Sequence, residues 1–238
     1  MEAHLNRTGN FTSSSIYLLM SDGKEKGTLG KPALTYIEDK SIELRLGRSL
    51  QKETNSKPTS FGKLVEERVF SLLSTEYILC SDLRFYHPLY NRWNGCPDML
   101  SEDKVCDIKV PYNIKIFTQK ADIMIANDVA KLKKLYPENY WQLVSNSILT
   151  DKPIAELIIY CPYLKELIEI KENLQNYDGD MNDVAWINWA KDEELPYLIE
   201  GNYYKNLYKL KWEVSAEDKE FLTNRVKMAI DKIKEGCA

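Results

Sequence analysis

The pattern of apolar and polar positions along this chain predicts an alternation of helices and strands. Helices are expected where apolar residues recur every three or four positions, and strands where they alternate with polar residues or form short runs. The predicted helices cover residues 12–20, 32–46, 59–73, 114–135, 140–149, 163–174 and 215–236. The predicted strands cover 77–90, the two arms of a hairpin within 95–110, then 155–161, 184–189 and 208–214. This order is typical of an α/β domain with a mixed sheet and helices on both faces.

The hairpin within 95–110 carries an unusual set of charges. Two short apolar runs flank a polar turn of four residues, which predicts two antiparallel strands. Alternation places Asp107 and Lys109 on one face of the second strand and Ile108 on the other. Asp98, at the head of the first strand, is then expected beside Asp107. Two carboxylates and one lysine therefore converge.

Such a convergence has a chemical use. Two carboxylates a few ångströms apart repel each other, and one of them protonates unless a cation lies between them. Oxygen ligands suit Mg²⁺ or Mn²⁺, and such an ion can hold a phosphodiester and lower the pKa of a bound water. Lys109 is placed to orient or deprotonate that water. The residues alone leave a second interpretation open, a surface hairpin with a solvated aspartate and lysine, since such pairs are common on exposed strands.

The helix predicted at 59–73 carries two adjacent acids with different surroundings. Glu66 and Glu67 lie about 100° apart around the helix axis. Glu67 shares its side with Lys63 and with serines, so it is expected to be solvated. Glu66 shares its side with Val69 and other apolar residues, so it is expected to be half-buried. It either pairs with a buried cation or faces a metal site, and the sequence does not choose between them.

Charge and length bound the partners of the chain. Its 238 residues have a net charge of −4, which argues against a generally cationic surface for nucleic acid. The most basic stretch is 109–134, where a phosphate backbone could run, although each single lysine there also fits a solvated helix face.

The cysteines and histidines exclude several classes of site. The five cysteines are odd in number and form no C-x-x-C pair, which argues against a disulfide framework, a zinc ribbon or an iron–sulfur cluster. His87 has no second ligand at metal-binding spacing and is expected to be structural. Without an apolar leader or a run of 18 apolar residues, we expect a soluble cytoplasmic protein, in a bacterium or a phage-infected cell, with no membrane partner.

Four segments resemble, in order, the phage lambda exonuclease family, also called the YqaJ-like viral recombinases, within the PD-(D/E)xK nucleases. Residues 7–14 resemble its R-x-G-x-x-T-x-S element, and residues 61–66 its W-G-x-x-x-E helix. Cys96-Pro97-Asp98 and Asp107-Ile108-Lys109 resemble its catalytic hairpin, and Tyr140-Trp141-Gln142 the start of its glutamine-bearing helix.

The resemblance implies a restriction-endonuclease-like fold in a single domain. Residues 1–57 would form N-terminal helices and loops, 58–160 the catalytic core, and 161–238 the completion of the domain. The implied activity is a 5′→3′ exonuclease on linear double-stranded DNA ends in phage-type recombination. A ring-shaped homotrimer and a single-strand annealing partner are also implied.

The resemblance also implies roles for single residues. Arg7 and Ser14 would hold the 5′-terminal phosphate. The metal would be Mg²⁺, with Mn²⁺ as a substitute, and the implied ligands are Asp98, Asp107, the Ile108 carbonyl and, for this or a second ion, Glu66. Lys109 would position or activate the attacking water, and Gln142 completes the catalytic set.

Three positions depart from the family pattern. Asp107 stands where glutamate is commoner, which shortens the side chain by one methylene. Cys96 replaces a serine, which weakens the case for a phosphate contact there. The second glutamine expected after Gln142 is absent, with Val144 or Ser145 in its place.

Two other functions fit the residues. One is a site- or structure-specific endonuclease of the same fold, which would nick covalently closed circular DNA. The other is a catalytically inactive DNA-binding module in which the hairpin is structural, which would bind DNA without Mg²⁺ and without cleavage.

Overall fold

The computed structural model describes residues 7–25, 27–50, 56–177 and 179–236. Its helical elements are η1 (Ser13–Met20), α2 (Lys31–Leu46), α3 (Lys57–Leu73), α4 (Ile114–Ile125), α5 (Val129–Leu135), α6 (Pro137–Thr150), α7 (Leu164–Glu172), η2 (Leu174–Asn176), α8 (Met181–Trp189), η3 (Asp192–Glu194) and α9 (Ala216–Gly236). Its strands are β1 (Phe11–Thr12), β2 (Ile78–Leu79), β3 (Phe85–Tyr86), β4 (Trp93–Gly95), β5 (Met99–Leu100), β6 (Lys104–Lys109), β7 (Ile154–Tyr160) and β8 (Leu207–Glu213).

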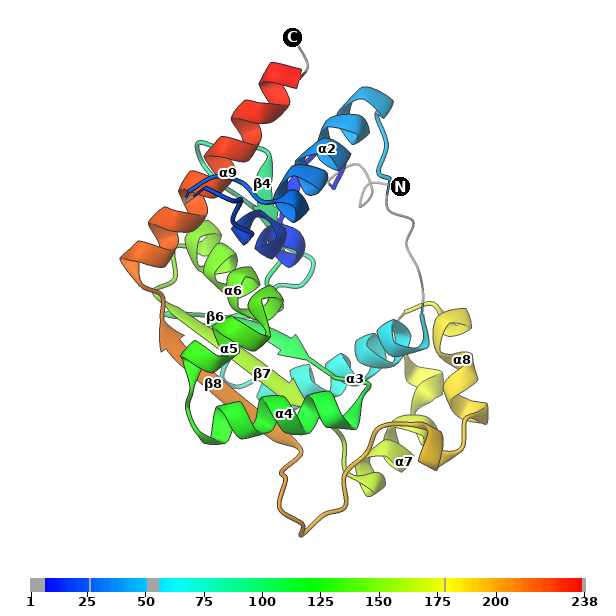
Figure 1. Ribbon diagram of the computed structural model, residues 1–238. Coiled ribbons are helices and arrows are strands. Elements are labelled where there is room, and N and C mark those ends of the chain that lie inside the picture. The colour runs from blue at the N-terminus through cyan, green and yellow to red at the C-terminus, as the bar shows by residue number, and fades with distance from the viewer. Residues whose placement is uncertain (1–6, 26, 51–55, 178, 237–238) are drawn as a thin grey trace.

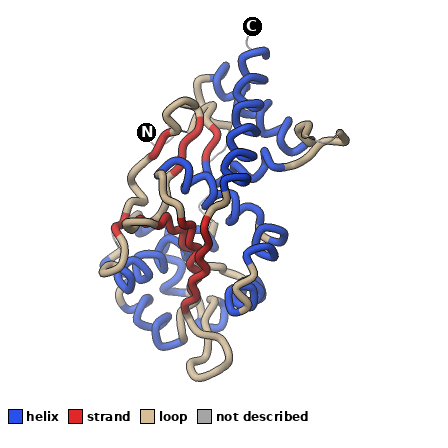
Figure 2. The backbone as a smooth tube through the Cα atoms, turned by 90° about the vertical axis from the view of Figure 1, so that its left-hand side faces the viewer, coloured by secondary structure: helices blue, strands red, loops and turns tan. Residues whose placement is uncertain are grey.

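The larger sheet has five strands in the order β2-β5-β6-β7-β8. The predicted hairpin is its β5–β6 pair, which is antiparallel, with Met99 opposite Cys106. β6 and β7 run parallel, with Asp107 opposite Leu157, and the crossover between them consists of α4, α5 and α6. β8 pairs antiparallel with β7. The mixed sheet predicted from the sequence is therefore confirmed, and Figure 2 shows its strands crossing the middle of the molecule between helices.

The smaller sheet joins the N-terminal segment to the hairpin. β1 pairs parallel with β4, with Phe11 opposite Trp93, and β3 pairs antiparallel with β4. Phe11 and Trp93 are both fully buried, so apolar packing fixes this pairing. As a result the segment around residues 7–14 lies next to Gly95, although about eighty positions separate them in the chain.

Two apolar cores lie on opposite faces of the larger sheet. The first contains residues of η1, α2, α6 and α9, and Val105 of β6 belongs to it. The second contains residues of α3, α7 and α8, and Cys106 and Ile108 belong to it. The predicted alternation of β6 is thus confirmed. In Figure 1, α2 and α9 lie in the upper part of the view, and α7 and α8 at the lower right.

The strand predicted at 77–90 is wrong, because two short strands in different sheets occupy this segment. β2 joins the larger sheet through β5, whereas β3 joins the smaller sheet through β4. Between them the Leu83 amide donates to the Cys80 carbonyl in a turn. The polar pair Ser81-Asp82 stands at this turn and breaks the apolar run.

The strand predicted at 184–189 is also wrong, because this segment belongs to helix α8. The Asp180 side chain accepts from the Asn182 amide and caps the helix. Val184 and Ile187, three positions apart, are both fully buried. Trp186 Nε1 donates to Ser60 Oγ at 3.1 Å, which ties α8 to α3.

Two further segments differ in detail from the predictions. The helix predicted at 114–135 is broken at Asn127, whose φ is 51°, and Asp128 caps the second part. Residues 13–20 form a 3₁₀ helix that Thr12 precedes without a side-chain capping bond. Part of the polar loop predicted at 47–57 lies outside the described residues. No helix in the described part of the chain combines the length and apolarity that a membrane span needs.

Candidate active site

The two aspartates of the hairpin converge as predicted. Asp107 has no exposed surface on β6. Asp98, which directly precedes β5, accepts a hydrogen bond at Oδ2 from the Ile108 amide at 2.6 Å. The backbone of one strand therefore fixes the carboxylate of the other. Because Asp107 is fully buried, the interpretation of this hairpin as a solvated surface pair is wrong.

Both oxygens of Asp107 have a partner. Lys109 Nζ lies 2.6 Å from Asp107 Oδ2, and the lysine side chain is 31% exposed. Gln142 Nε2, from α6, donates to Asp107 Oδ1 at 2.7 Å. The strand supplies the cation and the helix supplies the amide, so three of the predicted site residues are in direct contact.

Three carboxyl groups share one ammonium at this centre. Burial raises the pKa of Asp98 well above its usual range, and the Asp107 charge raises it further against the opposing effect of Lys109. Burial also raises the pKa of Glu66 to about 7, with Lys109 opposing and Asp107 adding to the shift. Burial alone would lower the pKa of Lys109, but Asp107 and Asp98 outweigh it and raise that pKa. The site thus carries an excess of negative groups that a second cation would relieve.

Glu66 is half-buried on α3, as its helical position predicts. Its electrostatic interactions with Asp98, Asp107 and Lys109 place it on the side of the helix that faces the two aspartates. The partly buried Lys109 and the two aspartates act on Glu66 electrostatically, so its surroundings are compatible with both alternatives left open by the sequence. Glu67 was expected to be solvated, but it is half-buried and lines a groove with Arg68.

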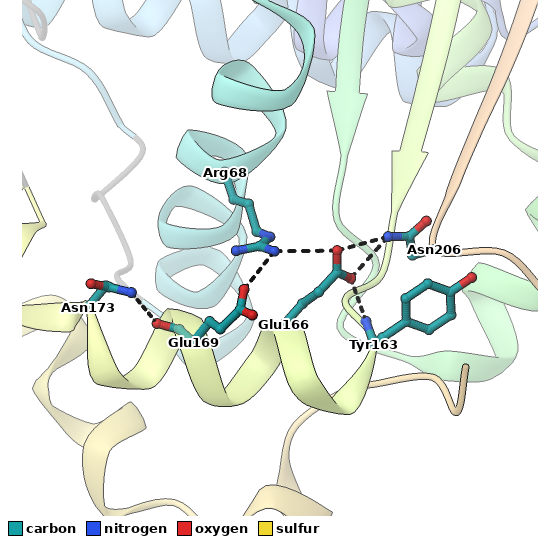
Figure 3. A network of polar contacts seen from close by, with 6 residues as sticks. All are labelled: Arg68, Tyr163, Glu166, Glu169, Asn173 and Asn206. Carbon is teal, nitrogen blue, oxygen red and sulfur yellow. Dashed lines mark hydrogen bonds and ion pairs between the residues drawn. The ribbon is translucent and has the colours of Figure 1, made fainter. Parts of the chain in front are cut away.

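A polar network anchors α3 on the side of Arg68 (Figure 3). The Arg68 guanidinium lies 2.9 Å from Glu169 Oε2 and 3.4 Å from Glu166 Oε1, both on α7. Asn206 donates to both Glu166 oxygens at 3.0 Å, and the Tyr163 amide donates to Glu166 Oε2 at 2.8 Å. This network fixes the position of α3 two residues from Glu66.

The predicted phosphate ligands line a cavity that reaches the carboxylates. Arg7 and Ser14 both line this cavity of about 360 Å³, together with Cys96. The same cavity is lined by Asp98 and Gln142. The small sheet explains this arrangement, because β1 places residues 7–14 beside β4 and the hairpin that follows it. The N-terminal element and the carboxylate centre therefore form one continuous site.

Two cations of this cavity were missed from the sequence. Lys63 of α3 and Arg84, which precedes β3, both line it. Arg84 Nη1 donates to Asn94 Oδ1 at 2.7 Å, and Asn94 is fully buried. Lys63 stands three positions before Glu66, so helix geometry could have predicted that the two side chains lie close together. No signal in the sequence places Arg84 here, because its position depends on the turn between β2 and β3.

Gly95 allows the cavity wall to form. A Cβ atom at this position would lie 2.2 Å from Ser13 Oγ and 2.4 Å from Asn146 Oδ1. Both distances are far below a van der Waals contact, so only glycine lets η1, β4 and α6 meet here. Ser13 Oγ also lies 2.8 Å from Ser145 Oγ, which in turn accepts from Trp93 Nε1 at 2.8 Å.

The donor set fits a hard divalent cation. The carboxylates of Asp98, Asp107 and Glu66 and the Ile108 carbonyl are all oxygen donors, which Mg²⁺ and Mn²⁺ prefer. Burial, with the Asp107 charge adding to it, raises the pKa values of Asp98 and Glu66, and a bound cation would oppose both effects. In this structure Lys109 contacts Asp107. Among the described residues, no three Asp, Glu, His or Cys side chains surround a common position that could hold a metal ion.

His87 packs as a structural residue, and the described cysteines are not paired with one another. The described cysteines, Cys80, Cys96, Cys106 and Cys161, are free thiols. His87 stacks on Trp93 with 4.8 Å between ring centroids, and its Nδ1 accepts from the Leu89 and Tyr90 amides. Its packing agrees with the structural role expected for it.

Comparison with solved structures reveals a shared fold. The chain is similar to the alkaline exonuclease LHK-Exo from Laribacter hongkongensis, with 14% identity and a TM-score of 0.62 over 99% of this chain and 93% of that one. LHK-Exo in complex with dAMP gives the same identity and TM-score, over 99% and 94%. A phage-related exonuclease from Haemophilus somnus 129PT matches at 16% identity and a TM-score of 0.62, over 95% and 94%. The α/β fold with a mixed sheet is thereby confirmed as one that exonucleases use. No protein-family model and no curated protein matches the sequence.

Proposed function

We propose that this protein is a metal-dependent DNA exonuclease that degrades linear double-stranded DNA in the 5′→3′ direction. The observation that carries the proposal is one cavity in which Arg7, Lys63 and Arg84 lie beside the Asp98 end of the carboxylate centre. Such a cavity suits a DNA strand: the cations would bind its terminal phosphate, and the carboxylates would lie at the next phosphodiester, which is cut. The fold shared with exonucleases, one of them bound to dAMP, supports the same activity.

The cationic end of the cavity would hold the 5′-terminal phosphate. The Arg7 guanidinium offers paired N–H donors that match phosphate oxygens, and the exposed Ser14 hydroxyl adds a neutral donor. Contacts of this kind bind the backbone without reading the bases. Cleavage would therefore be counted from the end of the strand and would not depend on sequence.

The carboxylate end would cut the next phosphodiester. Asp98, Asp107 and the Ile108 carbonyl, with Glu66 in support, would hold Mg²⁺ or Mn²⁺, which lowers the pKa of water and stabilises charge on the phosphate. Lys109 would orient the attacking water and neutralise charge that develops on the phosphate oxygens. Gln142 would keep the Asp107 carboxylate in its orientation. The water oxygen bonds to phosphorus while the bond to the 3′ oxygen of the terminal nucleotide breaks, which leaves a new 5′ phosphate.

The role in phage-type recombination, the ring-shaped homotrimer and the annealing partner belong to the same proposal and rest on the family resemblance alone. Light scattering after size-exclusion chromatography, with and without DNA, tests the trimer. A monomer under both conditions would exclude the ring.

The deciding experiment is degradation of linear duplex DNA with and without a 5′ phosphate, in Mg²⁺ and in EDTA. We expect loss of the phosphorylated substrate in Mg²⁺ only, with mononucleotides as product. Asp107→Ala should reduce the rate at least 10³-fold, on the order expected for loss of a metal ligand. Asp103→Ala, on the exposed turn of the same hairpin, serves as the matched control and should keep full activity.

Two outcomes would favour the other functions. Nicking of covalently closed circular DNA would point to an endonuclease. Tight binding of DNA in EDTA with no cleavage in Mg²⁺ or Mn²⁺ would point to an inactive binding module and would overturn the proposal.

A further inference from the structure

Lys120 is a buried cation beside the candidate active site. It lies on α4 with 6% of its surface exposed. Its ammonium donates to Asn139 Oδ1 and lies 4.6 Å from the centroid of the Tyr136 ring. Both partners are neutral, and among the described residues no carboxylate lies within ion-pairing distance of it.

A buried lysine without an acidic partner is unusual. Charged groups taken out of water are normally paired, because burial removes their hydration. Lys40, which is similarly buried, follows this rule with Glu43 Oε2 at 2.9 Å. For Lys120, burial lowers the pKa to about 8, with the Glu138 and Asp107 charges opposing from a distance and Lys109 adding to the shift. The ammonium therefore lacks the anion that its burial calls for.

Helix α6 places Lys120 in line with the rest of the site. Asn139, Gln142 and Asn146 stand at positions i, i+3 and i+7 and so share one face of this helix. Asn139 accepts from Lys120, Gln142 donates to Asp107, and Asn146 lies against Gly95 in the wall of the phosphate cavity. The helix rises about 10 Å over these seven residues.

The order along α6 gives a direction to a bound strand. The cavity extends from Gly95, against which Asn146 lies, to Gln142, which also contacts Asp107 of the carboxylate centre, and Lys120 lies beyond Gln142 at Asn139. Successive phosphates of one DNA strand advance roughly 3.4 Å along the duplex axis but lie farther apart through space, because the strand also winds around that axis. About 10 Å therefore suits two steps, which is three phosphates. A strand whose 5′ end is in the cavity and whose first linkage is at Asp107 would bring its next phosphate to Lys120.

We propose that Lys120 binds the phosphate on the 3′ side of the scissile one, which is the third phosphate counted from a phosphorylated 5′ end. This inference rests on the proposed function and adds a substrate contact to it. The incoming phosphate supplies the missing anion, and a third contact in line with the first two fixes which linkage is cut. Asn139 and Tyr136 act as positioning residues that hold the ammonium in place.

The test removes the charge of one phosphate at a time. Duplexes with a 5′ phosphate carry a single uncharged methylphosphonate at the third, fourth or sixth phosphate, and the release of the first nucleotide is measured under single-turnover conditions. With wild-type protein, neutralising the third phosphate should slow release roughly tenfold, since a charge-assisted hydrogen bond is lost. The same change at the sixth should have little effect.

Lys120→Met should slow cleavage of the unmodified duplex by a similar factor. In this variant the methylphosphonate at the third phosphate should cause no further loss, because both changes remove one interaction. Lys120→Arg should restore the sensitivity to that position. Lys227→Met makes the same chemical change at an exposed site on α9, outside the basic stretch 109–134, and is the matched control, with the wild-type response to all positions expected.

The outcomes separate the two proposals. Equal sensitivity of wild-type protein to neutralisation of the third, fourth and sixth phosphates overturns the Lys120 contact and leaves the exonuclease intact, and this result needs no variant to fold. Additive effects of Lys120→Met and the third methylphosphonate overturn it as well. If no DNA is cut, the proposed function fails, and binding of the same duplexes is measured by fluorescence anisotropy. Non-additive effects of Lys120→Met and the third methylphosphonate on binding would then support the Lys120 contact. Additive effects would overturn the contact as well.

Discussion

At the scale of single residues, the crowded carboxyl groups of the site destabilise the folded protein when no cation is bound among them. Asp107 is fully buried, and Asp98 and Glu66 both have raised pKa values beside it. Within the described part of the chain, Lys109 is the one cation that forms an ion pair in this group, and its partner there is Asp107. Crowded acids of this kind cost folding free energy, which is typical of sites that bind a metal or a substrate.

The raised pKa of Glu66 predicts how stability depends on pH. Its pKa moves from an ordinary value of 4.5 to about 7 on folding, chiefly through burial. Between these pH values the folded protein binds more protons than the unfolded chain, so the free energy of unfolding falls as pH rises from about 4.5 to about 7. For a half-buried group the loss is on the order of 1–2 kcal/mol. Urea unfolding of the metal-free protein at several pH values measures it.

Glu66→Gln should flatten this dependence, because it removes the titrating group and relieves Asp98. Glu67→Gln makes the same chemical change on another side of α3 and should keep the wild-type slope. Under the proposed function, Mg²⁺ should raise stability most at high pH, where the carboxylates are ionised. An unchanged slope in Glu66→Gln would show that Glu66 does not titrate in this range.

At the scale of elements, α3 carries Glu66 but is held by its other side. Arg68 joins it to α7 through Glu166 and Glu169, and the Arg68 side chain is 27% exposed. The contact between α3 and the second core sets the depth of Glu66, whereas this polar network sets the rotation and position of the helix. The two functions of α3, packing and site formation, therefore depend on separate residues.

Arg68→Met should destabilise the protein by about 2 kcal/mol, because Glu166 and Glu169 lose their cation in a partly buried setting. The proposed nuclease activity should then need more Mg²⁺ for half-maximal rate, since Glu66 is less well placed. Lys209→Met is the matched control. Its side chain is also 27% exposed, but the side chain of its partner Glu76 is 55% exposed, so its loss should cost under about 1 kcal/mol. Equal effects of the two variants on the Mg²⁺ requirement would contradict a positioning role for Arg68.

At the scale of the whole molecule, the two ends of the described chain are joined. Arg225 of α9 has 2% of its side chain exposed and forms an ion pair with Asp22. It also donates to the Thr28 carbonyl at 2.9 Å and to the Ser21 carbonyl at 3.1 Å. The C-terminal segment therefore does more than complete the sheet through β8, because α9 holds the loop between η1 and α2 in place. η1 in turn lines the cavity that Arg7 and Asp98 share.

Arg225→Met should lower the free energy of unfolding by about 3 kcal/mol, because the buried guanidinium is lost together with its ion pair and its two partly buried hydrogen bonds to carbonyls. Arg225→Lys should recover only part of this loss, since one ammonium cannot reproduce the forked geometry of the guanidinium. Thermal unfolding followed by circular dichroism tests both. A single shifted transition would show that the N-terminal segment and the sheet unfold together, whereas an early separate transition would show that α9 stabilises the N-terminal segment alone.

The sequence by itself determined the elements whose pattern is local and unambiguous. The hairpin, α3, β7 and β8 follow from periods of two and 3.6 residues, and the half-buried position of Glu66 follows from helix geometry alone. The convergence of Asp98 with Asp107 also follows locally, because a short hairpin fixes its own register. Residues 184–189 show the limit of such patterns. Their short apolar run fits a strand as well as a helix, and only the Asp180 cap and the contact with α3 decide it.

Only the tertiary structure decided which distant residues share the site. Arg84, Gly95 and Lys120 come from different parts of the chain, and their neighbours in space lie beyond the reach of a local pattern, as Asn139 does, 19 positions from Lys120. The pairing of β1 with β4 and the crossover from β6 to β7 through α6 bring them together. A local pattern reports only on neighbours within one or two turns or along one strand. The lack of an acidic partner for Lys120 depends on what every packed element places around it, so it can be seen only in the folded chain.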